Sequence, residues 1–307
     1  MPTNEVTRSL HECICRPCPG GFGTFFVPPG GLLPCHSRCC PGGPPAEPPE
    51  GHFLRTRPRR LGYSPQSGRH PAQAPPLKLL FLGDNGHHRP AERFRQLQPV
   101  LSERGIEVVY TDTATALNAQ TLGKYDGLIV YANTEKITPE QETALLDFVA
   151  SGKGFIPLHC ASYCFLNSPK YIELVGAQFL RHSTGTFRAT TAAPDHPVMK
   201  GYRGFESFDE TYVHAKHTEK DRLVLEYRED KKGKEPWTWV RTHGKGRVFY
   251  TAWGHDERTW GNAGFQELVE RGIRWACGGD PQDSLRSSRG LNTPPQMTEL
   301  RKDVAPF

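Results

Sequence analysis

Short apolar segments alternate with amphipathic ones in the first part of the globular sequence. Nearly continuous apolar runs occupy residues 77–83, 106–110, 127–131 and 155–159. Such runs are typical of strands buried on both faces of a parallel sheet. Between them, apolar residues recur at helical spacing in 90–104 and in a segment that begins with Thr138 and Pro139, an N-cap and a first-turn proline, and is stopped by Gly152. Strands that alternate with helices predict a doubly wound, mostly parallel α/β sheet with right-handed crossovers.

The pattern changes in the second half of the chain. Three further strands are predicted at 222–228, 237–242 and 247–253, joined by turn-rich sequence such as His243-Gly244-Lys245-Gly246. Strands joined in this way indicate an antiparallel extension packed onto the parallel sheet. A closing helix is expected from about 262 to 277, because this segment has an apolar face and is followed by two glycines.

Composition separates the domain, residues 77–279, from both ends of the chain. Residues 1–76 contain six of the nine cysteines and Pro/Gly-rich runs with few spaced apolar residues, so they are predicted to form a disordered leader. Residues 280–307 are expected to form an irregular tail. The leader also carries much of the positive charge excess, with 8 Lys/Arg against 4 Asp/Glu. The domain is therefore close to neutral, which gives no indication of nucleic-acid binding.

The sequence gives no indication of a membrane protein. No stretch approaches the roughly 18 apolar residues that span a bilayer, and the N-terminus lacks the basic and apolar regions of a signal peptide. We therefore expect a soluble, cytoplasmic protein without a transmembrane segment. The alternative is that the leader is a mis-assigned start that hides an export signal.

Polar residues follow the predicted strands at the edge where open parallel sheets bind ligands. They are His87 and His88, His159 with Cys160, Glu210, and His255 with Asp256. Imidazole and carboxylate groups could bind zinc or a similar divalent ion, or could act as a metal-free acid/base group. Simple hydrogen bonding of loops is the third interpretation of these histidines.

Several motifs, taken in order, resemble one family. They are the run 152–162 (Gly-Lys-Gly-Phe-Ile-Pro-Leu-His-Cys-Ala-Ser), His196-Pro197-Val198-Met199-Lys200-Gly201, Asp209-Glu210-Thr211-Tyr212, and 244–250 followed by Gly254-His255 and Trp260. Together with 83–88 they are similar to the ThuA-like (trehalose utilisation) branch of the class I glutamine amidotransferase-like superfamily. The resemblance covers about 77–279. It implies a flavodoxin-like fold and a role in disaccharide or keto-sugar metabolism.

The superfamily resemblance also suggests Cys160 as a nucleophile, with His255 as its base. The related amidotransferases place glycines around their cysteine, as Gly-x-Cys-x-Gly, because the sharp strand-to-helix turn demands them. Leu158 and Ser162 stand at those positions here. When the segment is aligned on strand length, His159 occupies the nucleophile position instead. Cys160 and Cys164 are then expected to be small buried core residues.

Aromatic residues are frequent in the same half of the domain: Tyr163, Tyr212, Trp237, Trp239, Trp253 and Trp260. Sugars stack on such rings, but aromatic residues of a protein core look the same in sequence. Both interpretations stay open at this point.

The function predicted from the sequence is a role in carbohydrate metabolism through a His/Glu site. His159, His255 and Glu210 are the candidate catalytic residues. His87, His159 and His255 are the candidate ligands of a divalent metal such as zinc; no nucleotide cofactor is indicated. A small-molecule carbohydrate is the expected partner, while the reaction, a hydrolysis or isomerisation of a sugar, and the oligomeric state stay open. The alternatives are a non-catalytic sugar-binding or interaction module and a cysteine-dependent amidotransferase-like hydrolase.

Overall fold

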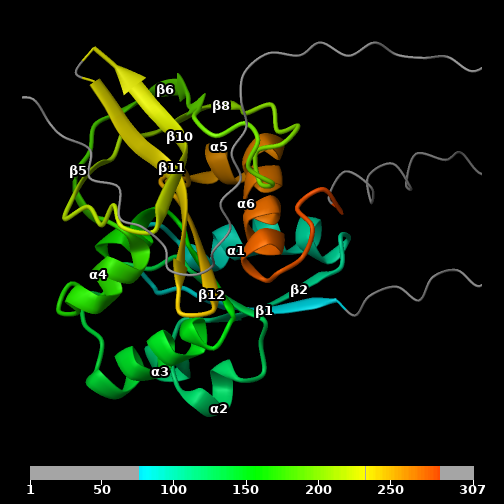
Figure 1. Cartoon of the computed structure of the whole chain (residues 1–307), viewed down its shortest axis with the longest axis vertical. Coiled ribbons are helices and arrows are strands. Elements are labelled where there is room, and N and C mark those ends of the chain that lie inside the picture. Colours follow the sequence, from blue (N-terminus) through cyan, green and yellow to red (C-terminus); the bar gives the residue numbers. More distant parts are fainter. Residues whose placement is uncertain (1–75, 232, 284–307) are drawn as a thin grey trace, which may run out of the picture. The chain divides into compact units, whose positions relative to one another are not determined.

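The computed structural model describes residues 76–231 and 233–283 (Figure 1). Nearly all of the predicted leader, including its six cysteines, and most of the predicted tail lie outside these ranges. Within them, no helix has the length and apolar character needed to cross a membrane.

An eight-stranded sheet forms the centre of the domain, in the order β2-β1-β3-β4-β12-β11-β10-β7. The parallel strands are β2 (Ile106–Thr111), β1 (Leu77–Leu82), β3 (Gly127–Val130), β4 (Gly154–Pro157) and β12 (Gly246–Thr251). The antiparallel strands are β11 (Gly233–His243), β10 (Arg222–Asp230) and β7 (Thr190–Thr191). The predicted α/β sheet with its antiparallel extension is therefore confirmed, and every strand expected from an apolar run is present.

Helices cover both faces of this sheet (Figure 1). On one face, α1 (Pro90–Ser102), α5 (Glu257–Trp260) and α6 (Ala263–Ala276) contact one another. The other face is covered by α2 (Ala119–Leu122), α3 (Pro139–Ala150) and α4 (Pro169–Val175). Of these, α3 contacts both α2 and α4. The N-terminus of α3 is fixed as the sequence predicts, by a capping box between Thr138 and Gln141. The arrangement is the doubly wound one expected from the alternating pattern.

Two small sheets were not predicted. One pairs β5 (Gln178–Arg181) with β9 (Val213–Ala215), and the other pairs β6 (Thr184–Arg188) with β8 (Glu206–Glu210). The short 3-10 helices η1 (Ala114–Ala116) and η2 (His159–Tyr163) complete the elements. β5 and β6 are short and partly or fully exposed. They therefore lack the apolar run by which a buried strand is found in sequence.

The tryptophans belong to the core. Trp237, Trp239, Trp253 and Trp260 are all completely buried. Trp239 stacks on Tyr250 with 4.1 Å between ring centroids, and Trp253 stacks on Phe187 at 4.3 Å. The sugar-platform interpretation is thus wrong for these four residues, because their faces are already covered by other side chains.

Candidate functional site

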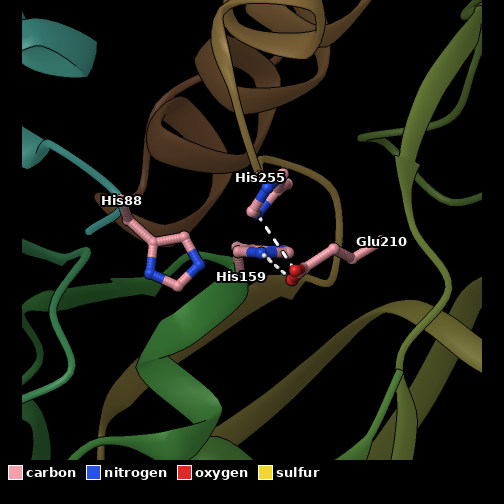
Figure 2. Close-up of side chains that lie close together, drawn as sticks. All are labelled: His88, His159, Glu210 and His255. Carbon is pink, nitrogen blue, oxygen red and sulfur yellow. Dashed lines mark hydrogen bonds and ion pairs between the residues drawn. The ribbon is translucent and has the colours of Figure 1, made fainter. Parts of the chain in front are cut away.

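Four side chains from distant parts of the sequence meet at the carboxyl edge of the sheet (Figure 2). His88 follows β1, His159 follows β4 and His255 follows β12, while Glu210 ends β8. One potential ligand atom from each lies within 4.8 Å of those from the other three. The structure thus brings together all three predicted catalytic residues, His159, His255 and Glu210. The fourth member, which follows the first strand, is His88 and not the predicted His87.

The His159 backbone has the unusual conformation of a sharp strand-to-helix turn. Its φ of 47° lies in the left-handed region, which non-glycine residues seldom adopt. Two buried hydroxyls, Ser162 Oγ and Tyr250 OH, each lie 3.1 Å from the His159 carbonyl oxygen and can donate to it. The expectation that His159, not Cys160, occupies the turn is consistent with this geometry, and strain of this kind is common at functional sites.

The ring of His159 is oriented by a backbone carbonyl. Its Nδ1 lies 2.6 Å from the Ala252 oxygen, and a carbonyl can only accept, so Nδ1 carries a proton. The opposite atom, Nε2, lies 3.2 Å from Glu210 Oε2. Two lone pairs cannot face each other at this distance without an intervening positive charge. Either Nε2 is also protonated and donates to Glu210, or a cation lies between the two groups.

Glu210 is the negative centre of the group. Its Oε1 lies 3.3 Å from His255 Nδ1, a buried nitrogen with no well-formed hydrogen bond to any described residue. Burial would raise the pKa of Glu210, but the close contacts of His159 and His255 with the carboxylate, and their electrostatic attraction, outweigh it and hold this pKa well below its ordinary range. In turn, the contact with Glu210 raises the pKa of His255 against the effect of burial. The carboxylate is therefore ionised at neutral pH.

His88 is held in its neutral form. Only 4% of it is exposed, and its Nδ1 lies 2.7 Å from Asn133 Oδ1. Burial, with smaller contributions from His159 and His87, lowers the pKa of His88 from 6.5 to about 2. With Nδ1 donating to the amide oxygen, Nε2 presents a lone pair, and this buried atom has no hydrogen-bond partner among the described residues.

His87 does not join the group, although the sequence suggested it as a metal ligand. Its side chain is exposed, and its ring lies beside that of His88, with 4.1 Å between centroids. It contributes no atom to the four-residue group and instead lines the adjoining pocket. Sequence alone could not choose between two adjacent histidines in a loop, because no strand or helix period fixes which of them points inward.

Asp209 supports the site and was missed. This fully buried carboxylate accepts hydrogen bonds from the backbone N–H groups of Glu210 (2.7 Å), Gly254 (2.9 Å) and His255 (3.1 Å) and from Thr259 Oγ1 (2.7 Å). It therefore ties the end of β8 to the turn that carries His255. The only signal in the sequence was a second acid next to Glu210.

A pocket of about 190 Å³ opens beside the group, lined by His87, His88, Asn133, Tyr163, Phe179, His182, Glu210 and Tyr212. Its wall is part aromatic and part polar. His182, another residue that sequence reasoning missed, places Nδ1 3.3 Å from Glu210 Oε1. It could not be anticipated because it follows β5, a strand without a sequence signal. Tyr163 and Tyr212 do reach the pocket, unlike the four tryptophans.

Cys160 does not have the environment of a nucleophile. It is completely buried, and burial, followed by the neighbouring Cys164, raises the pKa of its thiol well above the ordinary value. A reactive cysteine needs access to solvent and a lowered pKa. The cysteine-hydrolase alternative is therefore wrong for this geometry, and Cys160 and Cys164 are the buried core residues that the spacing predicted.

Comparisons with known proteins agree with the fold. A ThuA-like protein from Bacteroides uniformis superposes with a TM-score of 0.60 at 19% identity, over 70% of this chain and 98% of the other. A ThuA-like protein from Parabacteroides merdae gives 0.55 at 18% identity, over 67% and 91%. No curated protein sequence matches the chain. The family model described as ThuA, trehalose utilisation, matches residues 78–276, and on this match the chain belongs to the ThuA family.

Proposed function

We propose that His88, His159, Glu210 and His255 form a divalent metal centre of the zinc type. The observation that carries the proposal is the set of ring nitrogens that converge on one another and on the Glu210 carboxylate. His88 Nε2 has no hydrogen-bond partner among the described residues, while His159 Nε2 and His255 Nδ1 both face the Glu210 carboxylate, the latter without a well-formed hydrogen bond. Buried polar atoms are rarely left in this state, and a shared cation would satisfy all of them at once.

The donor set and the spacing support this assignment. Three imidazoles and one carboxylate are ligands that zinc accepts, and ligands about 2.0 Å from a tetrahedral ion lie roughly 3.3 Å apart. The distance from His159 Nε2 to Glu210 Oε2 is 3.2 Å and that from His255 Nδ1 to the other carboxylate oxygen, Oε1, is 3.3 Å, so each has this spacing. The Ala252 carbonyl and Asn133 orient the rings of His159 and His88, as outer partners of metal ligands commonly do.

The ligand we propose for the adjoining pocket is a carbohydrate. Phe179, Tyr163 and Tyr212 offer apolar ring surface, while Asn133, His87 and His182 offer hydrogen-bonding groups. A sugar presents the same mixture, with apolar C–H faces and polar hydroxyls. The family description, trehalose utilisation, points to the same class of ligand.

A metal bound here would act as a Lewis acid that polarises a sugar carbonyl or activates water. The chain's own residues would position the sugar and exclude solvent, and Glu210, oriented through Asp209, would hold negative charge at the centre. Proton transfer beside a sugar carbonyl and hydrolysis are the two reaction classes that such a site supports.

Elemental analysis of the full-length chain tests the metal. We expect close to one equivalent of zinc or a similar ion in the wild type and its loss in His88→Ala and in His159→Ala. His87→Ala is the matched control, because it removes the adjacent ring and should keep the metal. Circular dichroism checks that each variant is folded.

A wild-type protein that stays metal-free after dialysis against zinc would refute the metal centre. The group would then be a charged acid/base cluster, which the raised pKa of His255 favours in the absence of a cation. Equal metal loss in His87→Ala and His88→Ala would refute the assignment of His88.

A further inference from the structure

Two further pockets lie next to the pocket at the His/Glu group, and the proposed function does not use them. A second pocket of about 160 Å³ shares His182 with the first. A third, of about 150 Å³, shares Arg181, Val213, Arg228 and Asp230 with the second. Ligand sites commonly measure roughly 300–1,000 Å³, a range that the first pocket alone does not reach and the three together do. A ligand that fills this space would be longer than the first pocket.

Three cations line the second and third pockets, and we call this part the cationic groove: Arg181, Arg228 and Lys234. Arg181 is exposed, and no carboxylate of residues 76–231 or 233–283 lies within ion-pair distance of it. Lys234 pairs with Glu229 at 3.0 Å, but both side chains are largely open to solvent, so this pair is weak. Arg181 therefore has its full donor capacity available to a ligand.

Arg228 is a buried side chain of the groove that other residues hold in place. It is 93% buried, stacks over Trp237 and donates from one terminal nitrogen to Asp230 at 2.5 Å. Its Nε is buried and has no hydrogen-bond partner among the described residues. A buried guanidinium nitrogen without a partner is costly, so Arg228 keeps unused donor capacity in a side chain that lines the second and third pockets.

The two carboxylates that line the groove are already engaged. Asp230 accepts from Arg228, and Glu235 accepts from both the backbone N–H and Nδ1 of His214 at 2.9 Å. Three cations against two carboxylates give the lining of the second and third pockets a net formal charge of +1. The first pocket differs, since its only charged wall residue apart from histidines is Glu210.

We propose that the cationic groove binds an oxyanion, a phosphate or a carboxylate, on the same ligand whose sugar part occupies the first pocket. This rests on the proposed function. Arg181 directly precedes His182 and pairs with Val213 across β5 and β9, so the anion subsite is one residue away from the wall of the first pocket. Guanidinium groups bind phosphate and carboxylate through paired hydrogen bonds, and such charge-assisted bonds are strong. The ligand class is thus an acidic sugar rather than a neutral one.

Calorimetric titration of the metal-loaded full-length chain with three probes tests the subsite: glucose, glucose 6-phosphate and glucuronate. We expect at least one acidic probe to bind about tenfold or more tightly than glucose, and Arg181→Gln to remove most of this advantage while leaving glucose unchanged. The two acidic probes distinguish phosphate from carboxylate. Arg203→Gln, at an exposed arginine that lines none of the three pockets, is the matched control and should behave as wild type.

Binding of both acidic probes no tighter than glucose would overturn the proposal, and so would wild-type affinity of Arg181→Gln for the preferred probe. Metal content and glucose binding, measured on the same samples, separate the two levels of inference. A chain that binds no metal but still loses its acidic-probe affinity in Arg181→Gln would keep the subsite and refute the metal centre. A chain that contains metal but whose acidic-probe affinity is unaffected by Arg181→Gln would keep the metal centre and refute the subsite.

Discussion

The parallel half of the sheet and the segment 178–215 use their residues in opposite ways. β3 and β4 are buried at every position, whereas β6 is exposed at every second residue and otherwise half-buried. Ends of parallel strands deliver the histidines of the site. The segment 178–215 provides Glu210, the negative charge of the site. It also provides His182, which lines the first pocket, and Arg181, which lines the cationic groove. Stability and ligand chemistry are thus concentrated in different segments, and substitutions can separate them.

The largest effect is expected from a substitution in the parallel half. Phe81 is completely buried in β1 and packs against Phe94, Tyr110, Tyr131 and Trp260. Phe81→Ala removes this packing and should lower the free energy of unfolding by about 3–5 kcal/mol. Urea denaturation followed by fluorescence would measure the change.

Phe179→Ala is the counterpart in the segment 178–215. Phe179 is half-buried in β5 and lines the first pocket, so its loss should lower the free energy of unfolding by only about 1 kcal/mol. Its effect should fall on glucose affinity instead. Similar destabilisation by the two substitutions would contradict the division of roles between the segments.

A pH effect of intermediate size is expected in the antiparallel extension. Glu226 of β10 is completely enclosed, and burial, partly offset by a hydrogen bond from Thr238, raises its pKa from 4.5 to about 7. Between these values the folded state keeps a proton that the unfolded chain releases, so stability falls as pH rises from 4.5 to 7 and then levels off. The loss amounts to about 3 kcal/mol.

Glu226→Gln should abolish this dependence while keeping an acceptor for Thr238. Tyr202 couples to Glu226, but its pKa is raised well above 10, so it stays neutral in this range. Urea denaturation of both proteins at pH 5 and pH 8 would measure the difference. Parallel changes in wild type and variant would show that Glu226 does not titrate as proposed.

The contrast between the buried parallel strands and the segment 178–215 also explains how much could be predicted from the sequence. The runs at 77–83 and 127–131 fixed their strands because burial on both faces leaves an unbroken apolar signature, and Pro139 with Thr138 fixed the start of α3. His159, His255 and Glu210 were found because they follow such landmarks or a family motif. Arg181 and His182 were missed because β5, which ends at Arg181, is short and only partly buried and so has no apolar run by which it could be found. Asp209 was missed because a buried acid is recognised only by the donors around it, and these come from distant residues.

A small effect on stability should come from one hydroxyl that joins the two regions. Tyr250 OH lies 3.1 Å from the carbonyl oxygen of His159, 3.0 Å from Ser162 Oγ and 3.1 Å from Nε2 of His214, whose Nδ1 contacts Glu235. Tyr250→Phe keeps the ring stacked on Trp239 but releases the strained turn at His159. We expect a loss of about 1 kcal/mol in stability and about tenfold in metal affinity, the size typical of an outer partner of a ligand.

Tyr171→Phe is the matched control for this prediction. Its hydroxyl is equally buried and donates to the Ala161 carbonyl at 3.0 Å, two residues beyond His159, without reaching the turn itself. Stability should fall by a similar amount in both variants, but only Tyr250→Phe should weaken metal binding in a chelator competition and shift the visible absorption of the cobalt-substituted protein. If both variants bind metal equally well, the hydroxyl at position 250 contributes to folding alone, and the strained turn must be held by the packing of the parallel strands.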